Sequence, residues 1–374
     1  MVGRNTIVNE NTVKVGINKD AIKIGFIGAG YMGYGMAHNL LKNNYSVSVI
    51  AHKNRKPIDR LIDEGAIECK SMKELGEDNN VIVMCVTNTP IATEIANEIV
   101  SHLNEDDLVI DITTHQVNGS IEIEKIFSTN KVNYVESPVM GGPIQSKEGV
   151  LGAIVGSSDN NFILAKEILL SFCKNVVLFG PVGEGTKAKL INNFLALGTA
   201  TLVIETLKAT KHLNIDLQKF YDVAKLGSGN SGALNRITDK VIAGDYKGYI
   251  FSVNNTLKDM TYINELLSDL PNAEKLASLT KSFYQDAVDR GEGDLLISEL
   301  INKAWLILTN IIFKILEFLT NKFISIVYLI GVLILVLPGF LQGNTKFKIV
   351  IQNLSIWVAI ILVIVSLMVF FGMI

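Results

Sequence analysis

Residues 22–41, IKIGFIGAGYMGYGMAHNLL, decide the fold that we expect for this 374-residue chain. An apolar run typical of a strand ends in a glycine turn, and a helix-like segment follows at once. Gly28 permits a tight turn, Gly30 lets the backbone approach a pyrophosphate, and Gly33 allows the helix to pack on the strand. The helix N-terminus also favours phosphates. We therefore predict a dinucleotide site at Gly28, Gly30, Tyr31, Met32 and Gly33, with a purely structural turn as the alternative.

The strand–helix pattern continues on the C-terminal side of this turn. Four further runs are nearly all apolar, as buried parallel strands are: 45–51, 79–86, 107–113 and 132–139. Helix-like segments separate them. Repeated units of this kind predict an α/β fold, a doubly wound parallel sheet of Rossmann type with helices on both faces. We assign it to residues 21–183, preceded by a polar extension, residues 1–20, without a secretory signal.

The pattern changes after residue 183. Helical spacing dominates from there to about residue 302, starting with the long run KAKLINNFLALGTATLVIETLKATKHL at 187–213. We predict a second, all-helical domain over residues 184–302.

The tail, residues 303–374, differs again. Residues 323–342 and 354–374 contain no charged side chain, and each has about the ~20 apolar residues that cross a hydrocarbon core. Two such stretches in tandem predict two transmembrane helices, with a buried helix of a soluble domain as the alternative. Neither stretch has an ionisable group, which argues against an ion path.

Charge and cysteine content exclude several classes of function. The formal net charge is −3, so no surface for nucleic acid is indicated. The three cysteines are widely spaced without a CxxC pair, which favours neither a disulfide framework nor a zinc site. The histidines lack metal-ligand spacing, and we predict no metal. His115 could edge a pocket, whereas a satisfied core histidine is the alternative.

The segment after the second predicted strand bears on the choice of cofactor. NAD sites commonly place an acidic residue there for the ribose 2′-hydroxyl, and this segment has none. It is basic instead and could pair with a 2′-phosphate through His52, Lys53, Asn54 and Arg55. NADP is therefore the favoured cofactor and NAD the alternative; a solvated basic loop is the third reading.

Four more segments, taken with the glycine turn, suggest a family. They are DITTHQ at 111–116, SPVMGGPIQSKEGVLGAIVG at 137–156, GTKAKLINN at 185–193 and FSVNNTLKDM at 251–260. In this order they resemble the β-hydroxyacid dehydrogenases, which include 3-hydroxyisobutyrate and tartronate semialdehyde dehydrogenases, over roughly residues 21–301. The resemblance implies an NAD(P)-dependent oxidoreductase that interconverts a small 3-hydroxy acid and its semialdehyde or keto acid.

The resemblance places the general acid/base on Lys189, in the pattern K-x-x-N-N. Lys189 and Asn193 are four residues apart and share one face of a helix. A water-poor cleft lowers the pKa of a lysine, which makes proton exchange with a hydroxyl feasible. The further residues that the resemblance implies are Thr113, Gly141, Gly142 and Asn193 for substrate, and Val86, Thr87, Thr114 and Lys258 for cofactor.

The chain departs from the family pattern at a few positions. Met140 stands where the family has a hydroxyl that touches substrate, which puts the substrate in doubt more than the chemistry. Glu136 and Ser137 replace the usual Asp-Ala, and Val86 and Thr87 replace a frequent Leu-Pro.

Because the cofactor pool is cytosolic, we expect the folded part on the cytoplasmic side of a membrane and a lipid membrane as partner of the tail. The resemblance also implies a homo-oligomer formed through the helical domain. Two other functions stay open: a catalytically idle NADP-binding sensor anchored in a membrane, and a tail that is the working part and is regulated by the dehydrogenase domain.

Overall fold

The structure, a computed structural model, describes residues 19–52 and 54–302. The polar extension through residue 18, the basic residue Lys53 and the two predicted spans at 323–342 and 354–374 lie outside the described residues. The described residues form one compact unit.

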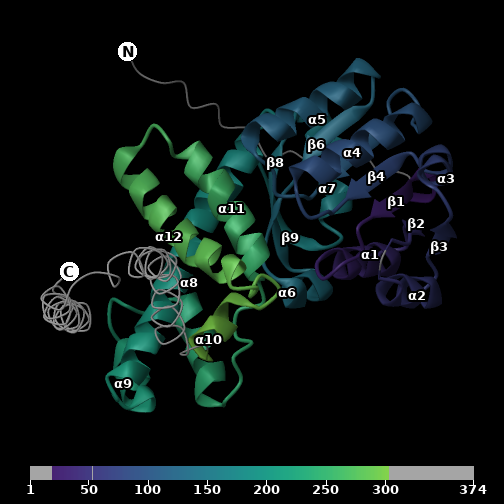
Figure 1. The fold of residues 1–374 in the computed structure, drawn as a ribbon. Helices are drawn as coiled ribbons and strands as arrows, with labels where there is room; N and C mark the ends of the chain where they lie inside the picture. Colours follow the sequence, from purple (N-terminus) through teal and green to yellow (C-terminus); the bar gives the residue numbers. More distant parts are fainter. Residues whose placement is uncertain (1–18, 53, 303–374) are drawn as a thin grey trace, which may run out of the picture. The chain divides into compact units, whose positions relative to one another are not determined.

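A nine-stranded sheet organises the N-terminal part of this unit (Figure 1). Six strands run parallel in the order β3-β2-β1-β4-β5-β6. Their bounds are β1 Lys23–Ile27, β2 Ser46–Ile50, β3 Ile67–Cys69, β4 Val81–Met84, β5 Leu108–Asp111 and β6 Asn133–Glu136. The connecting elements are α1 Gly33–Lys42, α2 Lys56–Asp63, α3 Met72–Asp78, α4 Thr89–Ile99, η2 Val100–His102 and α5 Val117–Thr129, and η1 Lys19–Ala21 precedes β1.

Side chains on the central strands alternate between two buried clusters. Val83 and Ile110 belong to one cluster, while their neighbours Ile82 and Val109 belong to the other. Both faces of the sheet are therefore covered, which confirms the doubly wound arrangement expected from the continuous apolar runs.

One edge of the sheet adds two antiparallel pairings to the parallel sheet that the apolar runs predicted. Strand β8, Leu151–Gly156, is antiparallel to β6 and to the short β7, Val139–Met140. Only the six-residue α6, Pro143–Glu148, lies between β7 and β8, too little for the crossover that a parallel pair requires. Strand β9, Cys173–Gly180, then follows α7, Asp159–Leu169, and pairs parallel with β8.

From residue 184 the described elements are helices, in keeping with the predicted helical character. They are α8 Glu184–His212, α9 Leu217–Ala224, α10 Gly232–Ile242, α11 Val253–Leu266, α12 Pro271–Asp289 and η3 Ile297–Asn302. Helix α8 packs against α10, α11, α12 and η3 and also contacts β8 and β9. Of the described helices it alone has the length and apolarity of a membrane span, but Leu190, Leu197 and Ile204 place it in the core of the helical part.

Candidate active site

The glycine turn between β1 and α1 leaves no room for side chains at two of its three glycines. Gly28 has a φ of +95°, and a Cβ there would lie 2.1 Å from the carbonyl oxygen of Cys85. A Cβ on Gly33 would lie 2.1 Å from the carbonyl oxygen of Gly28. A Cβ on Gly30 would meet nothing within 4 Å, so this residue faces open space. The turn therefore has the shape that a pyrophosphate needs, with the N-terminus of α1 behind it.

The basic segment after β2 has acidic partners that the sequence pattern did not reveal. The Arg55 guanidinium donates to both carboxylate oxygens of Glu68 on β3, at 2.5 and 2.8 Å, and to Oδ1 of Asp59 at 2.6 Å. This bonding raises the pKa of Arg55 and lowers that of Glu68. His52 and Asn54 are exposed. An acidic residue, Glu68, therefore lies beside the loop after β2, but it comes from the neighbouring strand β3 and not from the end of β2.

The loops that follow β4 and β5 are tied together by hydrogen bonds. The Val86 amide donates to Oγ1 of Thr113 at 3.1 Å, and the Thr113 amide donates to Oδ1 of Asp111 at 2.9 Å. Thr113 is 2% exposed, so its hydroxyl joins the two loops in this structure, and its contact with substrate stays a prediction. Lys258 from α11 reaches both loops and donates to the Thr87 carbonyl at 2.9 Å, while the Thr114 carbonyl lies 3.5 Å away.

Lys189 lies in the first turns of α8, beside the strand that leads to the predicted substrate loop. Its ammonium donates to the Val139 carbonyl at 2.8 Å. Burial lowers the pKa of Lys189 to about 8, a shift that the negative charge of Asp259 opposes and the positive charge of Lys258 assists. A lysine with this pKa exchanges a proton near neutral pH, as a general acid/base must.

Asp259 connects the other predicted residues of the helical part. Its Oδ2 accepts a 2.7 Å hydrogen bond from the Asn193 amide, and its Oδ1 lies 3.0 Å from the Lys258 ammonium. The structure thus brings Lys189, Asn193 and Lys258 together around one buried carboxylate. Asp259 follows Lys258 directly in the sequence, and nothing in the spacing shows that it also meets α8.

One backbone N–H of the glycine pair that follows β7 already forms a hydrogen bond within the protein. Gly141 has a φ of +117°, which favours glycine. The amide of Gly142 donates to Oε1 of Gln145 at 2.9 Å. A substrate carboxylate would have to replace the Gln145 side chain to reach this amide. Met140, directly before the pair, is half-buried.

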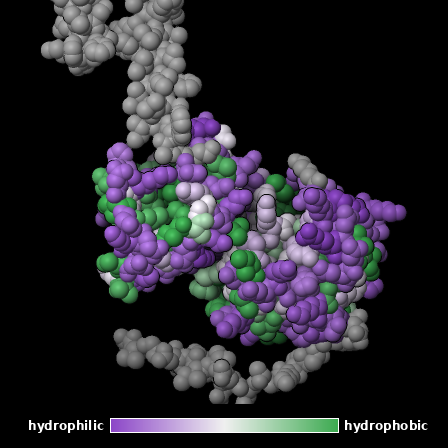
Figure 2. All heavy atoms as spheres, turned by 90° about the horizontal axis from the view of Figure 1, so that it is seen from below, coloured by the Kyte–Doolittle hydropathy of each residue, from purple (hydrophilic) through white to green (hydrophobic). Residues whose placement is uncertain are grey.

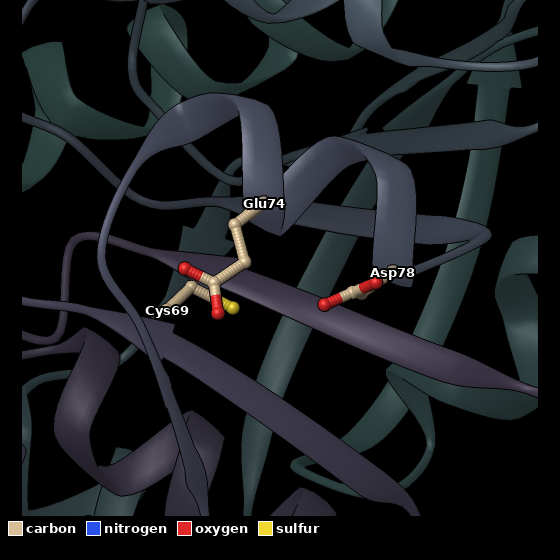
Figure 3. A group of neighbouring side chains, drawn as sticks. All are labelled: Cys69, Glu74 and Asp78. Atoms are coloured by element: carbon tan, nitrogen blue, oxygen red, sulfur yellow. The ribbon is translucent and has the colours of Figure 1, made fainter.

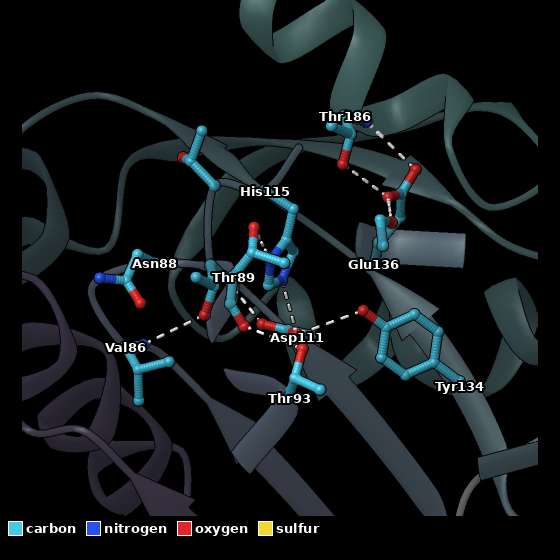
Figure 4. Close-up of polar contacts among 12 residues, drawn as sticks. Val86, Asn88, Thr89, Thr93, Asp111, His115, Tyr134, Glu136 and Thr186 are labelled. Atoms are coloured by element: carbon cyan, nitrogen blue, oxygen red, sulfur yellow. Dashed lines mark hydrogen bonds and ion pairs between the residues drawn. The ribbon is translucent and has the colours of Figure 1, made fainter. Parts of the chain in front are cut away.

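Glu136 fixes the start of the helix that carries Lys189. Its carboxylate is fully buried and accepts hydrogen bonds from the amides of Gly183 and Thr186, at 2.7 and 3.1 Å, and from the hydroxyls of Thr186 and Ser120 (Figure 4). A carboxylate at the N-terminus of a helix is favoured by the helix dipole. A Cβ at Gly156 would lie 2.1 Å from Oε1 of Glu136, so the strand also fits closely around it.

One group of side chains in the described residues has the spacing of metal ligands. Ligand atoms of Cys69, Glu74 and Asp78 lie within 4.8 Å of one another (Figure 3). The Glu74 amide donates to Oγ of Ser71, the N-cap residue of α3, and the Glu74 carboxylate accepts from the Lys70 amide at 2.7 Å. Burial raises the pKa of the Cys69 thiol, which disfavours the thiolate that binds metals. The Glu74 carboxylate is thus already engaged by the backbone, and the absence of a metal stays a prediction.

Two protein families match the chain, one after the other. The NAD binding domain of 6-phosphogluconate dehydrogenase matches residues 23–180, and the NAD-binding domain of NADP-dependent 3-hydroxyisobutyrate dehydrogenase matches residues 183–304. The chain is similar to a mitochondrial 3-hydroxyisobutyrate dehydrogenase-like protein of Arabidopsis thaliana, with 27% identity over 73% of this chain and 82% of that protein.

Solved structures show the same fold. A 3-hydroxyisobutyrate dehydrogenase from Salmonella typhimurium superposes with a TM-score of 0.69 at 24% identity, covering 75% of this chain and 99% of that one. The Mycobacterium tuberculosis 3-hydroxyisobutyrate dehydrogenase solved with L-serine gives a TM-score of 0.67 at 20% identity, covering 75% and 98%. The two successive family matches, together with the glycine turn and the lysine at the start of α8, establish that this chain belongs to the 3-hydroxyisobutyrate dehydrogenase-like family of NAD(P)-dependent β-hydroxyacid dehydrogenases.

Proposed function

We propose that this chain interconverts a small 3-hydroxy acid and its semialdehyde or keto acid, with Lys189 as the general acid/base. The observation that carries the proposal is the place of Lys189, beside the Val139 carbonyl and near Asn193, with a pKa lowered to about 8. When bound, the nicotinamide cofactor supplies the acceptor or donor of the hydride.

The residues around Lys189 have separate tasks in this proposal. Neutral Lys189 takes the hydroxyl proton of the alcohol during oxidation, and protonated Lys189 returns it to the carbonyl oxygen during reduction. Asn193, held by Asp259, orients the substrate. The glycine pair 141–142 receives the substrate carboxylate through backbone N–H groups, after the Gln145 side chain has left the Gly142 amide. A panel of 3-hydroxy acids and semialdehydes, assayed with the full-length chain and with NADP and NAD supplied separately, tests the proposal. If the chain turns over no compound of this panel, the result counts against the proposal.

The pH dependence should be opposite in the two directions. Oxidation needs neutral Lys189, so kcat should rise as pH increases through about 8; reduction needs the protonated amine, so kcat should fall over the same range. Initial rates from pH 6 to 10 under saturating substrate measure both profiles. Parallel profiles in the two directions would contradict the role of Lys189.

NADP is the proposed cofactor, and Glu68 should limit the preference for it. The Arg55 guanidinium would pair with the 2′-phosphate, but two carboxylates already neutralise it. Glu68→Gln should raise the ratio of kcat/KM for NADP to that for NAD about fivefold, because the Arg55 guanidinium then has one carboxylate fewer to pair with. Glu77→Gln, on the exposed surface of α3, is the matched control and should leave the ratio unchanged. A ratio that falls in Glu68→Gln would show that the 2′-phosphate does not bind here.

Membrane attachment and self-association complete the proposal. The two uncharged stretches at 323–342 and 354–374 would anchor the chain, with the dehydrogenase part on the cytoplasmic side, where its cofactor is available. Apolar side chains are exposed in the helical part, among them Leu195 and Leu202 on α8, both 70% exposed. Figure 2 shows apolar patches of this kind on an otherwise largely hydrophilic surface. Recovery of the chain with carbonate-washed membranes tests the anchor.

A further inference from the structure

His115 lies behind the cofactor loops and not in the pocket. The side chain is fully buried, so the possibility that it edges the pocket is not met in this structure. We propose that His115 is a positioning residue of the cofactor site, which holds the loops after β4 and β5 in the shape that receives the nicotinamide end of the cofactor. This inference rests on the proposed function.

A chain of buried polar contacts links His115 to both loops (Figure 4). Its Nε2 lies 2.8 Å from Oδ2 of Asp111, which is also fully buried and accepts a second hydrogen bond from the Tyr134 hydroxyl at 3.2 Å. Its Nδ1 lies 3.3 Å from Oγ1 of Thr89, the first residue of α4. The amide of Gln116 also donates to Thr89 Oγ1, at 3.1 Å.

A neutral His115 that carries its proton on Nε2 fits these contacts. An ionised carboxylate only accepts, so Nε2 of His115 donates to Asp111. In the neutral imidazole Nδ1 then accepts the Thr89 hydroxyl proton, and the Thr89 oxygen keeps a lone pair for the Gln116 amide. Each of these buried polar groups is satisfied in this arrangement, which favours a single conformation of the loop.

The two loops are therefore joined at two points, and two of the predicted cofactor-binding residues lie between these points. The first point is the hydrogen bond from the Val86 amide to the Thr113 hydroxyl. The second is the Thr89 hydroxyl, which contacts the His115 ring and accepts from the Gln116 amide. Thr87 and Thr114, whose carbonyls face Lys258, occupy the segments between these points. If the second point is lost, the loops populate other conformations, and the apparent Kd of the cofactor rises in inverse proportion to the competent fraction.

His115→Leu in the full-length chain tests this. We expect the Kd of NADPH, measured by its fluorescence, to rise about tenfold, the change that corresponds to about 1.4 kcal/mol and to one lost buried hydrogen bond to a charged group. The KM for cofactor should rise with it, whereas kcat should stay within about twofold, because the saturated complex contains only competent loops.

Ser298→Ala is the matched control for general destabilisation. The Ser298 hydroxyl is fully buried, donates to the Tyr246 carbonyl at 2.7 Å and accepts from the Tyr249 amide at 3.1 Å, in the helical part. Its loss should lower the Tm and leave the Kd of NADPH unchanged. If His115→Leu behaves like Ser298→Ala, with a lower Tm and an unchanged Kd of NADPH, the inference is overturned.

A second pair of variants decides the matter if His115→Leu does not fold. Thr89→Val removes the hydroxyl, retains the shape and leaves the Asp111–His115 contact intact, and it should also raise the Kd. Thr89→Ser retains the hydroxyl and should bind NADPH within about twofold of the wild type. If Thr89→Val binds NADPH with the Kd of the wild type, the inference about His115 is refuted and the proposed function is not affected. If the wild-type chain binds neither NADP nor NAD, the proposed function itself is refuted.

Discussion

Replacement of Lys189 by alanine should lower kcat by about 10²–10⁴-fold in both directions, the usual contribution of a general acid/base. The amine is the group that the structure places beside the Val139 carbonyl with a pKa lowered to about 8. Its loss removes the proton acceptor and donor but leaves the glycine turn between β1 and α1 untouched. The Kd of NADPH should therefore stay close to that of the wild type. Initial-rate kinetics and a fluorescence titration on the same preparation measure both quantities.

Lys189→Arg is the control for charge and size. A guanidinium retains the positive charge but does not release its proton at accessible pH, so this variant should be nearly as slow as the alanine variant. A variant Lys189→Ala that keeps more than a tenth of the wild-type kcat would assign proton transfer to another group. A wild type that binds NADPH tightly and turns over no substrate would favour the cofactor-binding sensor over the enzyme.

Glu136→Gln should lower the free energy of unfolding by about 2–4 kcal/mol, because it breaks a buried network around a carboxylate. The side chain keeps its size, but an amide NH₂ would replace one of the two carboxylate oxygens and would face the groups that now donate to that oxygen. The first turn of α8 would lose its N-terminal anion as well. Denaturation by urea, followed by circular dichroism, measures the change in midpoint and slope.

Glu105→Gln provides the comparison for Glu136→Gln. Glu105 forms an exposed ion pair with Lys131 at 2.8 Å, and such pairs contribute about 0–1 kcal/mol. The exposed variant should be close to the wild type in stability. A loss below about 1 kcal/mol in Glu136→Gln would mean that the carboxylate does not hold the start of α8. Because Lys189 follows in the next turn, kcat should fall with stability in Glu136→Gln.

The sequence alone determined the local features of the fold. The apolar run, the glycine turn and the helix at 22–41 follow from residues within one short segment, and the structure has β1 and α1 there. The spacing of Lys189 and Asn193 follows from the helix period, and both lie on α8. Continuous apolar runs also predicted a sheet covered on both faces, because strands buried on two sides cannot alternate with polar residues.

Only the tertiary structure decided which distant residues meet at the site. Glu68 lies beside Arg55 because β3 pairs with β2, and Asp259 lies beside Asn193 because α11 packs on α8. The antiparallel return of β8 likewise follows from the short connection after β7. Periodicity encodes which face of an element is buried, but it does not encode which element covers that face. The pairing of elements depends on the packing of the whole core. For this reason the tertiary structure, and not the sequence pattern, determines the partners of Arg55, Lys258 and His115.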